Sequence, residues 1–494
     1  MEVKFDRDIC PYLKNAVCQL QQQEQTQEVK LPEAMPDIGR ILCCRGQVLI
    51  RSKEWRGSSA AVSGGVMVWV LYIPEDGGEV RSVEAWVPFQ MRWDFPQAQR
   101  DGTVMVSPLI KSMDARATSA RKMMVRCEVQ LLGQALEPTQ AQICLPGQIP
   151  EDVQLRTEVY PVKLPVEAGE KLLQLEQALP VASGVMLYCN VIPEVIEQKV
   201  MAGRLVFRGS AAVHGLCMGS NGQPEAFDAA IPFSHYTELD KNHSTNADSR
   251  MDVVLTSMEL ENAEDGNLVL KASAAAQYVI SDRTMLELPV DAYSTERRVE
   301  LSFEPMELPA VLDEPYVSVS AAHTADITAR QILDAAWQPH HGICIKDEDN
   351  LNVTLPGQFF LLYMDGEGQL QAYTQQAQGT AQMPCQRENK VCCFLMSSRK
   401  PDVTMLADTV ELTAQADLCV PVSAGSRMEM IGALELGEQL AVDEDRPSLI
   451  LQRAGNESLW DIAKACGSTV EAIEKANALQ QDPEKGRMLL IPIP

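Results

Sequence analysis

VMVWVLYIPEDGGEVRSVEAWVPF, residues 66–89, gives the clearest indication of the fold. An apolar run opens it, a polar turn ends at Gly77, and an alternating run from Val80 to Val87 leads into Pro88 and Phe89. Two strand-like runs joined by a turn that contains glycine predict a β-hairpin, and the Pro-Phe pair predicts a corner after it.

The same pattern returns twice further along the chain. Ala211–Cys217 runs into Gly222 and is followed by Ile231-Pro232-Phe233, and Leu361-Leu362-Tyr363 runs into Gly368. The three turn glycines are 145 and 146 residues apart. A fixed period of this length predicts a repeated domain. The third copy is more divergent, since no Pro-Phe pair follows its hairpin.

The predicted fold is mainly β, with repeated sandwich or barrel-like domains and a small C-terminal α+β module. Two helices are expected outside that module. One covers Ile9–Gln23, where Leu13, Val17 and Leu20 recur at helical spacing, and the other covers Ala325–Trp337. The predicted divisions are 1–30 (helix and Gln-rich segment), 31–155, 156–300 and 301–436 (the three β repeats), 437–448 (acidic linker) and 449–494 (C-terminal module).

Composition limits the classes of partner. The chain has 494 residues, enough for three to five domains, and a formal net charge of -26, which repels nucleic acid and anionic lipid. Its 14 cysteines include no CxxC pair, so we predict buried reduced thiols. The amino terminus lacks a secretory signal pattern, and the longest apolar run, Val66–Ile73, is too short to span a membrane. We therefore expect a cytoplasmic protein without a membrane span.

No enzyme motif stands out. The sequence holds no P-loop, GxGxxG, HExxH or GxSxG, so we expect no enzyme activity, cofactor or metal site. The pair His340-His341 is expected at the surface or in a turn, and His214 and His235 in packing or surface positions. Four aromatic residues at strand spacing are expected in the core, with a recognition surface as the alternative: Trp69, Tyr72, Trp86 and Trp93.

The chain ends in LILQRAGNESLWDIAKACGSTVEAIEKANALQQDPEKGRMLLIPIP, which starts at Leu449. Ser458 can cap a helix, with Asp461 completing a capping box and Gly467 suited to its left-handed end. Thr469 can cap a second helix from Val470 to about Ala476, which Asn477 would end. The terminal run Met488–Ile491 would pair with Leu449–Leu451. The prediction is strand, helix, helix, strand.

This module resembles LysM through Ser458-Leu459-Trp460, Gly467-x-Thr469-Val470 and the terminal Leu490-Ile491-Pro492. The resemblance implies binding of N-acetylglucosamine glycans in a groove between the strand–helix loop and the helix–strand loop. By position that groove would be lined by Glu457, Ser458, Leu459, Asn477, Ala478 and Leu479. This chain has Asn456 and Glu457 where the family has glycine and aspartate, which affects the ligand contacts more than the fold. The alternative is that Ser458 is only a cap, Leu459 core and Asn477 a helix terminator.

The whole chain resembles the SPOCS-domain proteins of sporulating Firmicutes, of the SipL type. The resemblance rests on the repeated Leu-Tyr before a turn glycine, the Pro-Phe after it, the segment Pro36-Asp37-Ile38-Gly39-Arg40 and the C-terminal LysM. It implies a scaffold that assembles the spore coat on the forespore surface in the mother cell, through a coat-basement ATPase of the SpoIVA type. LysM would then dock a protein. The alternative is a cell-wall protein whose LysM binds peptidoglycan or a chitooligosaccharide.

Overall fold

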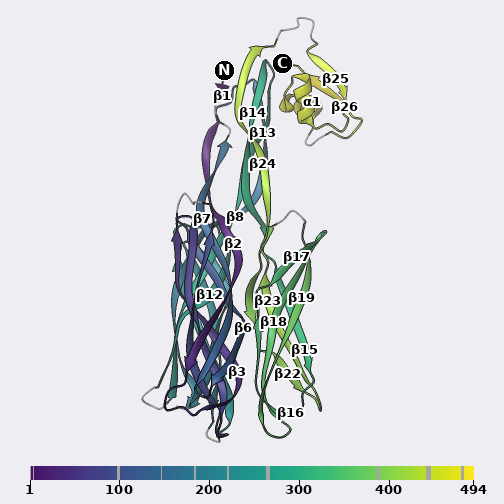
Figure 1. The fold of residues 1–494 in the computed structure, drawn as a ribbon. Coiled ribbons are helices and arrows are strands. Elements are labelled where there is room, and N and C mark those ends of the chain that lie inside the picture. The colour runs from purple at the N-terminus through teal and green to yellow at the C-terminus, as the bar shows by residue number, and fades with distance from the viewer. Residues whose placement is uncertain are drawn as a thin grey trace.

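The computed structural model is almost entirely β, with 26 strands and two helices among the residues it describes. It describes residues 2–3, 5–96, 101–145, 147–182, 185–219, 222–262, 267–386, 390–440, 447–479 and 483–493. The strands form an elongated body that narrows to a stalk, and a small module with both helices lies beside the tip of the stalk (Figure 1). The mainly β prediction is confirmed.

The first unit of the body has six strands in two antiparallel sheets, ordered β3-β4-β5 and β2-β7-β6. The two sheets pack face to face, because Val66, Val68 and Val70 of one share a buried cluster with Met123 and Val125 of the other. The strands are β2 (Asp6–Lys30), β3 (Ile38–Arg56), β4 (Ser59–Pro74), β5 (Arg81–Asp94), β6 (Thr103–Ser119) and β7 (Lys122–Leu145).

The second unit has the same strand order, β9-β10-β11 and β8-β13-β12. Its hydrophobic cluster also takes in Leu49, Trp69 and Leu71 from the first unit and Phe360 and Leu362 from the third. The three units therefore share a core. The strands are β8 (Val153–Ala182), β9 (Met186–Met201), β10 (Arg204–Met218), β11 (Pro224–Glu238), β12 (Asp248–Asn262) and β13 (Asn267–Ser294).

The third unit follows this plan with interrupted strands. Its two sheets are ordered β16-β18-β17, with β19 on β18, and β15-β23-β21, with β22 on β23. The strands are β15 (Tyr316–Ala325), β16 (Ala329–Pro339), β17 (Ile343–Asp347), β18 (Asn350–Asp365), β19 (Leu370–Pro384), β21 (Phe394–Ser398), β22 (Asp402–Met405) and β23 (Val410–Cys419). The short strand β20 (Lys390–Val391) pairs instead with β24 (Val422–Gln439).

The three hairpin turns adopt the same backbone conformation. Gly77, Gly222 and Gly368 have φ of 76°, 74° and 78°, a left-handed region that glycine enters without a steric penalty. The turn before the hairpin strand is also left-handed in each unit, at Gly57, Gly203 and Glu348. The glycines from which the sequence period was measured thus occupy equivalent turns.

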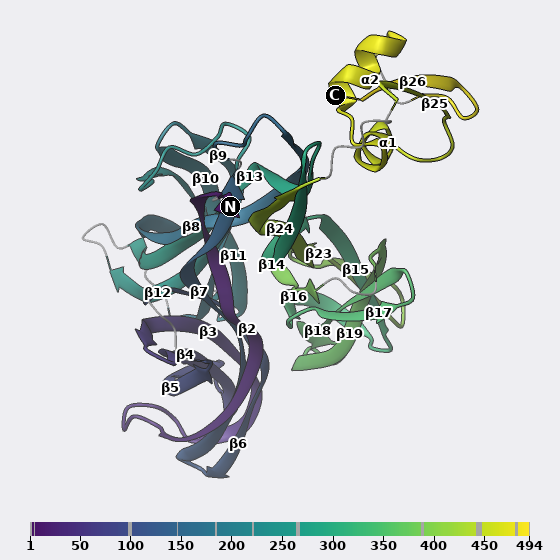
Figure 2. The ribbon, with the colours of Figure 1, turned by 90° about the horizontal axis from the view of Figure 1, so that it is seen from above.

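The stalk is built from three β-ribbons, one from each unit. They are the ends of β2 and β7, the ends of β8 and β13, and the pair β14 (Arg297–Asp313) and β24 (Val422–Gln439), which β1 (Glu2–Val3) joins at its edge. Side chains from all three ribbons form one buried cluster, among them Cys10, Leu288 and Met430. Seen from above, the three units surround the ribbons (Figure 2).

Both helices predicted outside the C-terminal module are wrong. Residues 9–23 and the Gln-rich segment after them form the edge strand β2, which pairs with β7 along its length. The first unit therefore starts near Asp6, not at residue 31. Residues 329–339 form β16, where Ile332 pairs with Tyr363 and Trp337 with Phe359. In both places, pairing with a distant strand overrides a local helical pattern.

Of the other sequence predictions, some are confirmed and some are wrong. All fourteen cysteines are free thiols, either buried or half-buried. Trp69, Tyr72 and Trp93 are buried as expected, but Trp86 is 37% exposed beneath Arg51. His340 and His341 lie in the connection after β16, but both are buried, because that connection packs against the first unit and His341 bonds the Ser107 carbonyl. The predicted linker 437–448 begins inside β24, and residues 441–446 lie outside the described part.

Candidate functional site

The C-terminal module has the predicted strand, helix, helix, strand order. β25 (Leu449–Arg453) pairs antiparallel with β26 (Met488–Pro492), and α1 (Leu459–Cys466) and α2 (Val470–Asn477) lie between them in the sequence. Ser458 caps α1 in a capping box with Asp461, Gly467 ends it with φ of 62°, and Thr469 caps α2. The capping residues in the sequence predicted each of these helix ends.

The two loops of the predicted groove lie at one end of the module. The Ala454 amide donates to the Arg487 carbonyl, and the Gly486 amide donates to the Ala454 carbonyl, which ties the loop after β25 to the loop before β26. The Arg487 guanidinium also donates to the Asn477 carbonyl. The structure therefore brings together the two segments that hold the predicted site residues.

Three of the six predicted groove residues have structural partners. The Ser458 hydroxyl accepts from the Asp461 amide, and Leu459 is buried in the module core. The Asn477 side chain donates to the carbonyls of Ile473 and Leu490 and accepts from the Leu490 amide, which fastens α2 to β26. These contacts fit the cap, core and terminator roles.

The other three differ in exposure. Glu457 and Ala478 are exposed, and Ala478 ends α2 with φ of 48°. Leu479 is half-buried and packs on the module core. Glu457 is thus the one charged member of the predicted groove, and it faces solvent.

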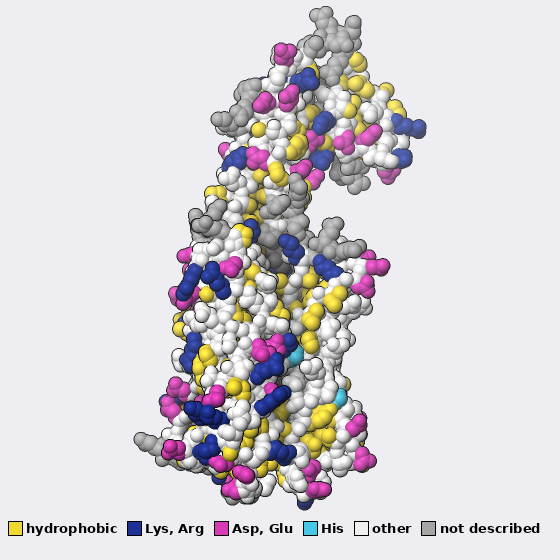
Figure 3. Space-filling model, viewed as in Figure 1, with side chains coloured by type: hydrophobic (Ala, Val, Ile, Leu, Met, Phe, Trp, Pro, Cys, Tyr) yellow, Lys and Arg dark blue, Asp and Glu magenta, His cyan; other side chains and the backbone are white. Residues whose placement is uncertain are grey.

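An exposed apolar surface, which the sequence reading missed, covers the outer side of the β25-β26 ladder. Leu451 is 64% exposed and its cross-strand partner Leu490 is 37% exposed, with Leu449 and Met488 beside them. Hydrophobic side chains gather on this side of the module (Figure 3). Exposed and buried residues alternate along β26: Met488 and Leu490 are exposed, and Leu489 and Ile491 are buried. This two-residue alternation is the sequence signal that could have predicted the apolar surface.

The module contacts the stalk through one face of α1. Trp460 Nε1 donates to Asp291 Oδ2 at 2.8 Å, and Lys464 Nζ donates to both oxygens of the same carboxylate. The Trp460 ring meets Tyr293 edge to face at 4.9 Å, and the Tyr293 hydroxyl donates to the Ser468 carbonyl. This face is separate from the β25-β26 ladder, so the apolar surface stays open.

Charge also stabilises this contact. Burial raises the pKa of Asp291, but the hydrogen bonds from Lys464 and Trp460 outweigh burial and lower the pKa overall. Burial raises the pKa of Tyr293 to about 12. Asp291 is therefore ionised, and Tyr293 is a neutral donor near neutral pH.

A second cluster of polar side chains joins the three units in the body. His214 on β10 lies between two carboxylates, with Nδ1 2.6 Å from Asp228 and Nε2 2.6 Å from Asp334 of β16. The Tyr188 hydroxyl of β9 donates to Asp334. Arg45 of β3 places its guanidinium 4.6 Å from the ring centre of Phe360 and over the Tyr188 ring.

The polar joint is the group Arg45, Tyr188, His214, Asp228 and Asp334, and burial shifts the pKa of three of its members. Burial raises the pKa of Asp334 and lowers the pKa of Arg45 and of His214, although Asp228 opposes the shift of His214. A histidine between two carboxylates can move a proton, but here Asp334 is buried between packed strands and His214 is half-buried, whereas Asp228 is exposed. β3, β9 and β16 are the second strands of their units, so equivalent strands converge on the joint.

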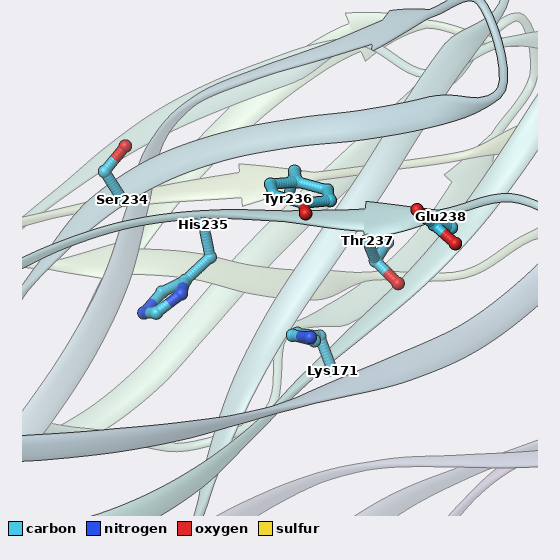
Figure 4. A pocket seen from close by; sticks show the side chains of 6 residues that line it. All are labelled: Lys171, Ser234, His235, Tyr236, Thr237 and Glu238. Atoms are coloured by element: carbon cyan, nitrogen blue, oxygen red, sulfur yellow. The ribbon is translucent and has the colours of Figure 1, made fainter.

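Two hollows lie on the body. One, of about 360 Å³, lies between the first and third units and is lined by Arg45, Met113 and Phe360 among others. The other, of about 460 Å³, lies on the second unit along Ser234–Glu238 of β11 and opposite Lys171 of β8. In Figure 4, His235 and Thr237 point to the same side of the strand as Lys171. Its lining is that of an open, polar strand surface.

Within the described part of the chain, neither helix has the length and apolarity that a bilayer crossing requires.

Comparison with known proteins gives one match. Residues 37–118 match the family model described as SipL, SPOCS domain. The match covers β3 to β6, four of the six strands of the first unit. Residues 37–118 are therefore a SipL-like SPOCS domain, and this domain suggests a sporulation-related role at the coat. No curated protein and no solved structure matches the chain.

Proposed function

We propose that this protein is a non-enzymatic scaffold of spore coat assembly whose C-terminal module, of LysM type, docks a protein. The exposed apolar face of the β25-β26 ladder carries this proposal. An apolar patch that remains open after the module has contacted its own stalk is typical of protein interaction sites. The SPOCS match supports the sporulation setting.

The three units are, in this proposal, three copies of the SPOCS domain. The recurring strand order and the equivalent left-handed turns support this, although the family match covers the first unit alone. Three copies that share one core give a stiff body, which can hold a docking module at a fixed distance from whatever the body contacts.

The partner we propose is a coat-basement ATPase of the SpoIVA type. The test is co-purification of the full-length protein from sporulating cells, compared with a chain that lacks residues 449–494. We expect the ATPase to be recovered with the full chain and lost with the deletion. Recovery with both chains would move the docking site to the SPOCS units and contradict the proposal.

A point variant tests the apolar face more sharply. Leu451→Ser with Leu490→Ser removes the exposed apolar pair while leaving the buried Leu489 and Ile491 in place. We expect partner recovery to fall at least about tenfold, or about 1.4 kcal/mol. Ile196→Ser, at an equally exposed apolar residue of β9, is the matched control and should bind normally.

Binding of peptidoglycan glycans is the alternative. Two observations favour it. The two loops of the predicted groove lie together, and Glu457, which precedes the N-cap residue of α1, is exposed to solvent. Sedimentation with purified peptidoglycan tests it. Glu457→Gln is a cleaner probe than changes at Ser458 or Asn477, because those side chains hold the fold. Pelleting that Glu457→Gln abolishes and the Leu451/Leu490 change does not would support the glycan function.

We also propose, as part of the scaffold function, that the protein has no catalytic activity. The polar joint groups a histidine with two carboxylates, and the buried position of Asp334 where the three units meet fits a structural role. Mixing the protein with muropeptides should leave them unchanged, and any turnover that His214→Gln abolishes would contradict the proposal.

A further inference from the structure

A pair of thiols lies at another place where the three units meet. Cys18 of β2 and Cys392, just before β21, have their Sγ atoms 3.1 Å apart. This separation is shorter than a normal contact between two sulfur atoms and longer than a disulfide of about 2.05 Å. The pair joins the first unit to the third across 374 residues of chain.

The surroundings of the pair contain a fixed positive charge. Arg250 of the second unit lies with its guanidinium 3.7 Å from the ring centre of Phe394 and donates to Gln134. The Cys392 backbone is fixed as well, because its amide donates to the Pro421 carbonyl. Both cysteines are half-buried, unlike Cys189, which is buried.

The two thiols differ in acidity. The hydrogen bond from Cys18 and the nearby charge of Arg250 together lower the pKa of Cys392 to about 7, against the effect of burial. The same hydrogen bond raises the pKa of Cys18. By contrast, burial alone raises the pKa of Cys189 to about 12. The thiolate is the reactive form of cysteine.

We propose that Cys18 and Cys392 form a redox-active thiol pair that closes into a disulfide between the first and third units when it meets a low-molecular-weight disulfide. The Cys392 thiolate attacks one sulfur of the reagent and releases a thiolate, giving a mixed disulfide. Cys18 then loses its proton to solvent and attacks Cys392 Sγ, which releases the second thiol. The two cysteines lose two electrons, and the reagent is reduced to two thiols.

A second thiol contact makes the assignment testable. Cys393 is hydrogen-bonded to Cys344 of β17, within the third unit. Cys392 and Cys393 are neighbours, so each of two adjacent thiols has its own partner. A disulfide at Cys393 would stay within one unit, whereas a disulfide at Cys392 crosses between units.

The experiment treats the full-length protein with oxidised glutathione near neutral pH, followed by tryptic digestion without reductant and mass spectrometry. Cys18 lies in the peptide 15–30, Cys344 in 331–346, and Cys392 with Cys393 in 391–399. We expect a link between 15–30 and 391–399, which Cys392→Ser abolishes and Cys393→Ser leaves in place. A link of 391–399 to 331–346 alone, a stable glutathione adduct at Cys392 or an unchanged digest would overturn the proposal.

Alkylation rates give an independent readout that does not depend on the oxidant. Iodoacetamide at neutral pH should modify Cys392 faster than Cys189, and Cys18→Ala should slow the reaction at Cys392 because the donor that stabilises the thiolate is lost. Circular dichroism of each variant shows whether the fold is retained. Equal rates at Cys392 and Cys189, or no effect of Cys18→Ala in a folded variant, would contradict the proposal.

Discussion

The three-unit body and the C-terminal module are held together in different ways. In the body, one hydrophobic cluster contains side chains from all three units, and the stalk takes a ribbon from each. The module has its own core, to which the body contributes Tyr293. The repeats of the body therefore depend on one another, whereas the module is a separate unit positioned by a small contact. The body should therefore unfold as one cooperative block, and the module should respond independently.

Trp93→Ala is expected to have the largest effect. Trp93 is buried between the sheets of the first unit, packs on Gly133 and donates from Nε1 to the Gln19 carbonyl. Truncation should lower the free energy of unfolding of the body by about 3–5 kcal/mol, measured by denaturant titration. Trp86→Ala is the control, because that ring is partly exposed, and its cost should be about 1 kcal/mol or less. Separate transitions for the three units would contradict a cooperative body.

Arg45→Met at the polar joint should cost somewhat less, about 3 kcal/mol. The change removes the positive charge of Arg45 near Asp334 and leaves a buried carboxylate that is held by His214, Tyr188 and the Ala335 backbone amide. Adding Asp334→Asn to Arg45→Met should recover part of the loss, because the uncompensated charge disappears. Arg51→Met, at a surface arginine over Trp86, is the control and should cost under about 1 kcal/mol. Additive losses at Arg45 and Asp334 would show that the two groups do not interact.

Tyr293→Ala should free the module from the stalk without weakening the body. The change removes the ring that packs on Trp460 and the hydroxyl that donates to Ser468, together worth about 1–2 kcal/mol. Hydrogen exchange should speed up in α1, while the unfolding midpoint of the body stays the same. Tyr236→Ala, at an exposed tyrosine of the second unit, should leave exchange in α1 unchanged. A lower midpoint for the body would mean that the module is part of its core.

Acid should weaken the contact between Asp291 and α1, and this effect should be the smallest of the four. The pKa of Asp291 is lower when the module is docked than when it is free, so the stabilisation is fully present above the ordinary carboxyl pKa of about 3.9. It is lost as the pH falls below that value through the docked pKa. Small-angle scattering between pH 5 and pH 3 should show the module moving away from the stalk. Asp291→Asn should remove this pH dependence, and a persistent transition would assign it to another group.

The sequence predicted the module well and parts of the body poorly. The residues that begin and end the two helices act on backbone groups a few residues away, so their effect can be predicted without knowledge of the rest of the fold. They are Ser458, Asp461, Gly467 and Thr469. The helical pattern in residues 9–23 was misleading for the opposite reason. The partners of that segment lie on β7, more than a hundred residues later, and no local pattern reports them.

The β character of the chain, the spacing of the turn glycines and the order of elements in the C-terminal module could all be predicted from the sequence. Those features depend on backbone preferences and on contacts between near neighbours in the chain. The tertiary structure alone decided which strands pair, how equivalent strands meet at Arg45 and Asp334, where Cys18 meets Cys392, and how Asp291 receives Trp460. Each of these depends on contacts between residues far apart in the sequence, whose geometry is fixed only when the three units pack into one body.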